Sequence, residues 1–229
     1  MMGNDPQNPS TPMSGLRALL KRLLWPRHQS MAAALAEQDR LRRELHHRVA
    51  NNLQILASII SLQARESDSP SARNAYALIE VQIQVIALVQ RRLPDGNDGQ
   101  PIDMAGLITE LCALLEAGPG LPDAPRLQMG CAVASLALAP DQAMPVALLI
   151  AVAALHAARH APPGPVTVNI AASGTGGTIE LAVHAQGLEA AARLPVPRLM
   201  AAMVRQLQGT LARDGVNGSW IVRFAAAPA

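Results

Sequence analysis

The stretch with the clearest capacity for chemistry is residues 44–54, which read ELHHRVANNLQ. Two adjacent histidines are followed by an arginine and then by paired asparagines. An exposed imidazole is largely neutral at neutral pH, so its ring nitrogen can attack a phosphoryl group without prior activation. Glu44 lies one helical turn before Arg48 and can form an ion pair with it. Arg48 can still offer positive charge to an incoming phosphate. These residue types indicate phosphoryl transfer, with His46 and His47 as the candidate carriers.

The element that carries the two histidines distinguishes them. Residues 30–67 contain neither Pro nor Gly, and apolar residues recur every three or four positions, as on an amphipathic helix. On that helix His47 points about 170° away from the apolar stripe, whereas His46 lies on its flank. Asn51 follows His47 by one turn and can orient a water or a phosphoryl oxygen. Geometry alone leaves ordinary surface histidines as an equal alternative. The stripe consists of Leu41, Leu45, Val49, Leu53, Leu56 and Ile60.

A second helix is predicted over residues 72–93, after a break at 68–71 where Ser69 or Ser71 can cap it. This helix carries two apolar stripes, so it requires burial on more than one side. A single hairpin gives this helix one packing neighbour, whereas two hairpins in a four-helix dimer bury its other apolar side as well. The stripes are Ile79, Ile83, Ile86 and Leu93, and Leu78, Val81, Val85 and Leu88.

The turn formers of residues 94–101 separate this hairpin from a part with a mixed pattern. The glycine-rich loop 173–177 lacks the Lys-Ser/Thr of a phosphate-binding loop and precedes a strand, so it predicts a hairpin. Helices and hairpin-linked strands together predict a two-layer α+β domain over residues 101–229. We expect helices at 102–116, 141–160 (with Asp141 as a possible cap) and 197–208, and strands at 127–133, 166–171, 178–183, 210–213 and 219–224.

Composition excludes several other classes of protein. Half of the 229 residues are apolar, which argues against disorder, and no apolar run has the length of a membrane span. Aromatic residues make up 2% and the net charge is +2, so nucleic acid is not an expected partner. The two cysteines have no zinc spacing, and a reduced, cytoplasmic location is expected. Residues 1–30 form an N-terminal arm whose basic segment 16–25 either packs on the bundle or docks on a membrane surface or partner.

Residues 44–63 resemble the phosphoacceptor box of bacterial sensor histidine kinases of the second dimerisation-and-phosphoacceptor type. The resemblance implies a helical-hairpin domain over residues 31–94, which forms a four-helix bundle as a homodimer. It implies a histidine-kinase-type ATPase α/β sandwich over residues 101–229. In that family the phosphorylated histidine directly precedes the arginine, which corresponds to His47.

The resemblance also implies that the ATP-binding chemistry is degenerate. Ala151 and His156 stand where the family has two asparagines, Ala185 where it has the adenine-binding aspartate, and Glu189 where it has a glycine. Val152 replaces the usual acid, and the glycine-rich lid is missing. Alanine cannot coordinate Mg²⁺, so we expect neither ATP nor a resident cofactor. His156 and His160 are four residues apart, but no third metal ligand is evident.

The chain thus resembles dimeric histidine phosphotransferases of bacterial phosphorelays. In this interpretation His47, assisted by Arg48 and Asn51, accepts a phosphoryl group from a receiver-domain aspartate and passes it to another response regulator. The receiver supplies the Mg²⁺. One alternative is a response-regulator phosphatase or phosphate sink, in which Asn51 positions the hydrolytic water. Another is a non-catalytic pseudokinase that binds a regulator or a kinase, and an active autokinase is the least favoured.

Overall fold

The computed structural model describes residues 13–93, 100–117 and 126–226, with the backbone alone for residues 13–30 and for positions 32 and 39. The chain divides into two compact units, residues 1–43 and residues 44–229. Helix α1 (Met13–Glu66) runs through the first unit and into the second. The predicted arm falls partly on residues 1–12, which lie outside the described residues, and the side chains of segment 16–25 are not described either.

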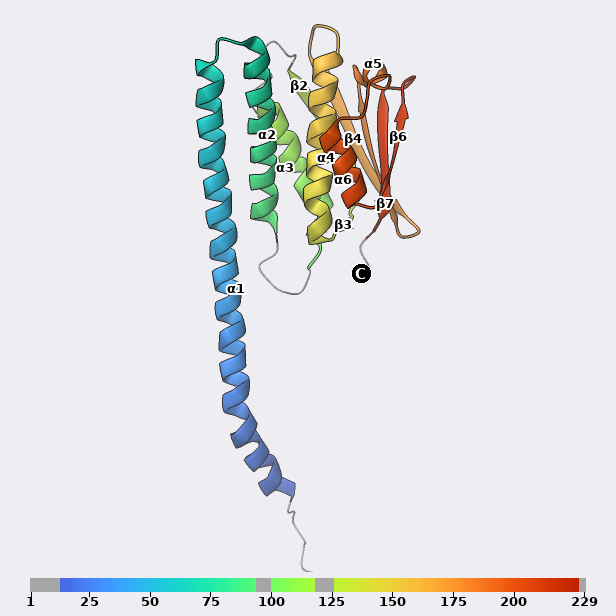
Figure 1. The fold of residues 1–229 in the computed structure, drawn as a ribbon. Coiled ribbons are helices and arrows are strands. Elements are labelled where there is room, and N and C mark those ends of the chain that lie inside the picture. The colour runs from blue at the N-terminus through green and yellow to red at the C-terminus, as the bar shows by residue number, and fades with distance from the viewer. Residues whose placement is uncertain (1–12, 94–99, 118–125, 227–229) are drawn as a thin grey trace, which may run out of the picture. The chain divides into compact units, whose positions relative to one another are not determined.

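The predicted helical hairpin is present. Helix α1 ends at Glu66, and α2 (Pro70–Arg92) returns alongside it (Figure 1). Of the two predicted caps, Ser69 is the one used: its hydroxyl accepts a hydrogen bond from the Ala72 backbone N–H at 3.4 Å. Pro70 follows at the first helical position, where its missing N–H costs no hydrogen bond.

The second half contains a five-stranded sheet in the order β2-β4-β5-β7-β6. The edge strand β2 pairs parallel with β4, and the other neighbours are antiparallel. The predicted hairpins 166–183 and 210–224 are confirmed, with strands slightly longer than expected. The strands of the sheet are β2 (Leu127–Val133), β4 (Val166–Thr175), β5 (Thr178–Ala185), β6 (Thr210–Asp214) and β7 (Ser219–Ala225), while β1 (Ile102–Asp103) and β3 (Ala137–Leu138) form a separate pair.

Helices cover one face of the sheet. Alternate residues of β4 and β5 are buried beneath α4. The described residues of this half form four helices: α3 (Met104–Ala117), α4 (Pro140–His160), α5 (Leu188–Ala191) and α6 (Arg198–Gln206). The predicted cap of α4 was wrong: Pro140 occupies its first turn and Ala139 the N-cap position, so Asp141 lies inside the helix. The conformation of Pro140 suits a first turn, which moves the helix start ahead of Asp141.

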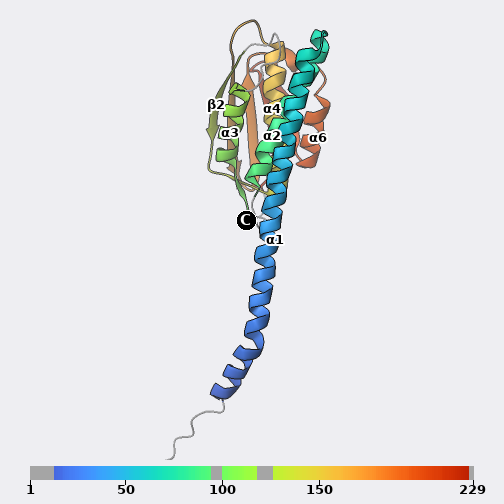
Figure 2. The ribbon, with the colours of Figure 1, turned by 90° about the vertical axis from the view of Figure 1, so that its left-hand side faces the viewer.

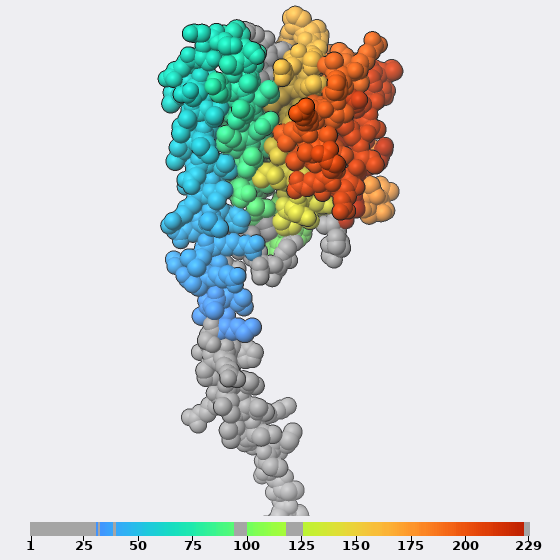
Figure 3. Space-filling model, viewed as in Figure 1, coloured from blue at the N-terminus to red at the C-terminus, as the bar shows by residue number. Residues whose placement is uncertain are grey.

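Helix α2 packs on two sides, but one of its neighbours differs from the predicted one. Val81, Val85 and Leu88 enter the same hydrophobic core as α3 and α4 of their own chain. The space-filling view shows α2 (green) between α1 and α4 (Figure 3). The second stripe therefore does not require a partner hairpin, because the α/β half buries it.

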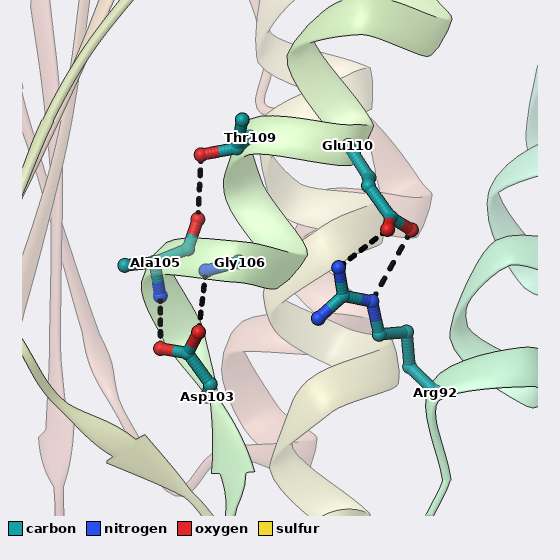
Figure 4. A network of polar contacts seen from close by, with 6 residues as sticks. All are labelled: Arg92, Asp103, Ala105, Gly106, Thr109 and Glu110. Carbon is teal, nitrogen blue, oxygen red and sulfur yellow. Dashed lines mark hydrogen bonds and ion pairs between the residues drawn. The ribbon is translucent and has the colours of Figure 1, made fainter.

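Polar contacts join α2 to the middle of α3 and cap the start of α3 (Figure 4). The guanidinium of Arg92 donates from Nε and Nη2 to the two carboxylate oxygens of Glu110. Asp103 caps α3 by accepting hydrogen bonds from the backbone N–H groups of Ala105 and Gly106, at 3.1 and 3.0 Å. This Asp103 cap explains why the helix begins two residues later than the predicted 102.

One helix in the described part of the chain, α4, is long and apolar enough to cross a membrane by length and composition. Of its most apolar window, 78% is buried inside the fold. Its apolar residues therefore have an explanation in the core of the α/β half.

Candidate phosphoacceptor site

His47 lies on the solvent side of α1, as its helical position predicts. Its side chain is exposed, and so are those of Asn51, Gln54 and Ser58 on the same stripe. The buried residues of this part of α1 are Ala50 and Ala57, which point about 70° away from His47 around the helix. The packed side of α1 at this level therefore does not cover the imidazole.

His46 has a different environment, although it is the next residue. Its side chain is half-buried, and its Nδ1 lies 3.1 Å from the side-chain oxygen of Gln90 on α2. This contact joins the two helices of the hairpin. The prediction that His46 leans toward packed neighbours is confirmed, and one of its ring nitrogens is already engaged.

Charged groups flank His47 as the sequence suggested. The guanidinium of Arg48 forms an ion pair with Glu44, one turn earlier on α1. The Arg48 side chain is 73% exposed, so the pair leaves most of its surface open to an approaching anion. Asn51 is exposed one turn beyond His47. The structure thus presents an imidazole, a guanidinium and an amide on solvent-facing positions of one helix.

A groove of about 720 Å³ continues along the same stripe of α1. Gln54, Ser58 and Arg65 line it on α1, and Arg91 and Leu114 line it from α2 and α3. This groove was not predictable from the sequence, because its walls come from three helices that only the tertiary fold brings together.

At the floor of the groove lies Glu80, which is only 8% exposed. Burial raises the pKa of its carboxyl group, and a hydrogen bond with Ser61 and the charge of Arg65 oppose that effect. Gln84 donates a hydrogen bond to the Glu80 carboxylate at 3.3 Å. An acid set between the apolar residues Ile79 and Val81 is a local signal that could have been noticed in the sequence.

Several apolar side chains on α1 remain exposed, among them Leu45, Leu56 and Ile59, at 59%, 49% and 48%. We refer to these three residues as the apolar face. Around the helix they point about 140° from Ala50 and Ala57, and about 150° from His47. A second chain that covered the apolar face would therefore leave the imidazole open.

Small residues are buried at the positions where the resemblance implied a nucleotide site. Ala151 and Ala185 are buried in the core of the α/β half. At Gly187, which has a φ of +91°, a Cβ would lie 2.5 Å from the Ala157 carbonyl oxygen, so this loop packs directly on α4. Glu189 is exposed, and its carboxylate accepts a hydrogen bond from the Gly187 backbone N–H. Neither alanine offers a side-chain oxygen that could coordinate Mg²⁺.

His156 lies beside Trp220 of β7, with ring centroids 5.3 Å apart, and beside His160 at 4.6 Å. Burial, followed by the charges of His160, Arg159 and Arg213, lowers the pKa of His156 to about 4. The ring is thus neutral and packed at neutral pH. Among the side chains that the structure describes, no three His, Cys, Asp or Glu residues gather as metal ligands.

Comparison with known proteins supports the assignment of the helical segment. A family model described as "Histidine kinase" matches residues 44–117. The chain is 43% identical over 60 positions to the sensor histidine kinase PdtaS of Mycolicibacterium smegmatis, which is 26% of this chain and 12% of that protein. PdtaS of Mycobacterium tuberculosis is 40% identical over 67 positions, 29% of this chain and 13% of the relative. The match thus spans about an eighth of these relatives.

Solved structures extend the similarity to the fold of the α/β half. The blue-light activated histidine kinase of Erythrobacter litoralis EL346 aligns with 82% of this chain and 58% of its own, with a TM-score of 0.50 and 17% identity. The predicted fold class, a helical hairpin followed by a histidine-kinase-type α/β sandwich, is therefore confirmed. Over residues 44–117 the chain matches the histidine kinase family in sequence, and it has the fold of a histidine kinase domain.

Proposed function

We propose that this protein is a histidine phosphotransferase of a two-component phosphorelay and that His47 carries the phosphoryl group. The observation that carries the proposal is the contrast between the two histidines of the motif. His47 is exposed beside Arg48, whereas His46 is engaged with Gln90. Of these two histidines, His47 is the one whose ring is exposed to another protein.

The transfer needs little from this chain beyond placement. A ring nitrogen of His47 attacks the phosphorus of a receiver aspartyl phosphate, the N–P bond forms, and the aspartate carboxylate leaves. The reverse attack by the aspartate of a second receiver passes the group on. Arg48 stabilises the negative charge of the phosphoryl oxygens, and Asn51 orients one of them. The receiver supplies Mg²⁺, which neutralises further charge.

The same residues support transfer without ATP-dependent autophosphorylation. Ala151 and Ala185 offer no side-chain oxygen, and the loop at Gly187 lies against α4. Glu189 adds negative charge where phosphates would approach. The chain therefore receives its phosphoryl group from a partner rather than from bound ATP.

The groove that begins at Gln54, about two turns from His47 along α1, provides a docking surface for the receiver. Gln54 and Ser58 extend from the His47 stripe into the groove, and Arg65 and Arg91 add positive charge there. The apolar face on the far side of α1 pairs with a second copy to complete a four-helix bundle. Because His47 points about 150° from the apolar face, the dimer keeps both imidazoles accessible.

The test is to incubate the protein with a radiolabelled phosphoreceiver and to look for acid-labile, base-stable label on the chain. The wild type acquires the label, and His47→Ala does not. The matched control His46→Gln changes the neighbouring imidazole and keeps the label. Label on His47→Ala, or label acquired from ATP alone, would overturn the assignment.

A phosphatase is distinguished in the same assay by loss of phosphate from the receiver. Asn51→Ala would abolish that loss if Asn51 positioned a hydrolytic water, while His47→Ala would leave it intact. For a pure interaction protein neither substitution would matter. The phosphorelay assignment requires the opposite ranking, with His47→Ala as the severe variant.

A further inference from the structure

Cys112 and Cys131 are 19 positions apart in sequence, but the fold brings them together. Cys112 lies on α3 and Cys131 on the edge strand β2, and these two elements pack against each other (Figure 2). A hydrogen bond close to the two cysteines joins the helix to the strand: the Met129 backbone N–H donates to the Glu116 carboxylate at 2.6 Å. That contact fixes the register between helix and strand.

The spacing on the two elements places the thiols opposite each other. Cys112 and Glu116 are one turn apart on the same face of α3, about 6 Å along its axis. Cys131 and Met129 are two residues apart on the same face of β2, about 6.6 Å along the strand. With Glu116 beside Met129, these nearly equal distances bring Cys112 beside Cys131.

The electrostatics of Cys112 agree with this placement. Burial is the main cause that raises the pKa of Cys112 to about 12, and the charge of Cys131 and a side-chain hydrogen bond with it add to the effect. Cys112 is buried and Cys131 is exposed, and both are free thiols. The pair therefore consists of one accessible and one protected sulfur on adjacent elements.

We propose that Cys112 and Cys131 form a redox modification site, which closes to an intramolecular disulfide in the presence of a small-molecule disulfide such as oxidised glutathione. The thiolate of Cys131 attacks one glutathione sulfur, a mixed disulfide forms, and one glutathione leaves. The sulfur of Cys112 then attacks that of Cys131, and the second glutathione leaves. Two protein thiols lose two hydrogen atoms, and one oxidised glutathione becomes two reduced molecules.

The order of attack follows from the environments. Cys131 reacts first because it is exposed on a sheet edge. Once Cys131 is a mixed disulfide it can no longer be a thiolate, so its charge no longer opposes the ionisation of Cys112. The resulting bond joins β2 to α3 at a second point, next to the Glu116–Met129 contact. This modification is independent of the proposed phosphotransfer at His47.

The experiment equilibrates the full chain with glutathione buffers of graded oxidation, blocks the remaining thiols by alkylation, and measures intact mass. The expected product has lost two hydrogen atoms and takes up no alkylating agent. The variant Cys131→Ser, at an exposed position, should lose none, and Cys112→Ala should retain one glutathione on Cys131. Wild-type protein that stops at a glutathione adduct, or forms disulfides only between chains, would overturn the proposal.

A second measurement tests whether the fold, and not only the short separation of the cysteines along the chain, brings the two thiols together. The same equilibration in guanidinium chloride reports how readily the unfolded chain closes this loop. If the fold holds the thiols together, the equilibrium constant for closure should be about tenfold or more higher in native buffer. Equal constants in the two solvents would show that the packing of α3 on β2 does not align the sulfurs.

Discussion

The histidine packed beside Trp220 makes the stability of the α/β half depend on pH. In the folded chain the pKa of His156 is about 4, against an ordinary value of 6.5. Below pH 6.5 the unfolded chain therefore binds a proton at this position that the folded chain does not bind. Stability is fully present above that value and falls as the pH decreases toward 4.

The size of the effect follows from linkage. A shift from 6.5 to about 4 corresponds to at most ~3.4 kcal/mol, and to ~2 kcal/mol between about pH 7.5 and about pH 5. His156 is only half-buried, so water screens part of this difference. We expect about 1 kcal/mol of lost stability over that interval.

The assay is urea unfolding followed by circular dichroism at both pH values. We expect the wild type to lose stability at the lower pH and His156→Leu to lose much less. The control His160→Gln removes the exposed neighbouring imidazole. It should retain most of the pH dependence of stability, because burial is the largest cause of the lowered pKa of His156. If His156→Leu and the wild type had equal pH dependence, the reasoning would be refuted.

Three other perturbations test the packing of the fold and the proposed dimer. Gly187→Ala forces a Cβ to within 2.5 Å of the Ala157 carbonyl oxygen at a φ of +91°, and should cost about 1–3 kcal/mol in urea unfolding. The Arg92–Glu110 pair is partly exposed, so a double-mutant cycle with alanines should give a coupling of about 0.5–1 kcal/mol; a zero coupling would show that the pair is incidental. Ile59→Glu should shift sedimentation of the homodimer toward the monomer while changing monomer stability by less than about 0.5 kcal/mol, and an unchanged dimer would exclude the apolar face as the interface.

The different exposures of His46 and His47 were predictable because they depend only on helical periodicity. The angle of His47 from the apolar stripe already predicted an exposed ring, and the flank position of His46 predicted partial burial. The strands at 166–183 were predictable for the same reason, since alternation along β4 and β5 needs no knowledge of their neighbours. The local sequence pattern was sufficient to predict a feature wherever that feature depended on a single helix or strand.

Features that depend on tertiary packing were not predictable in this way. The Val81–Val85–Leu88 stripe predicted burial correctly, but periodicity does not identify the covering element, and the cover is α3 and α4. The proximity of Cys112 and Cys131 was not predictable, because only the packing of α3 on β2 brings the two residues together. The start of α4 was misplaced because Asp141 and Pro140 compete as start signals, and the conformation of Pro140 determined the start.

The shared core around α2 limits how the hairpin can be recombined in engineered proteins. Val85 and Val89 are fully buried, and the elements packed on α2 are α3 and α4. A chimera that joined this hairpin to a foreign C-terminal half would place these valines against a surface not shaped for them. The part that can be exchanged as a unit is therefore α2 together with α3 and α4, whereas the solvent-facing residues of α1 can be varied to change partners without disturbing that core.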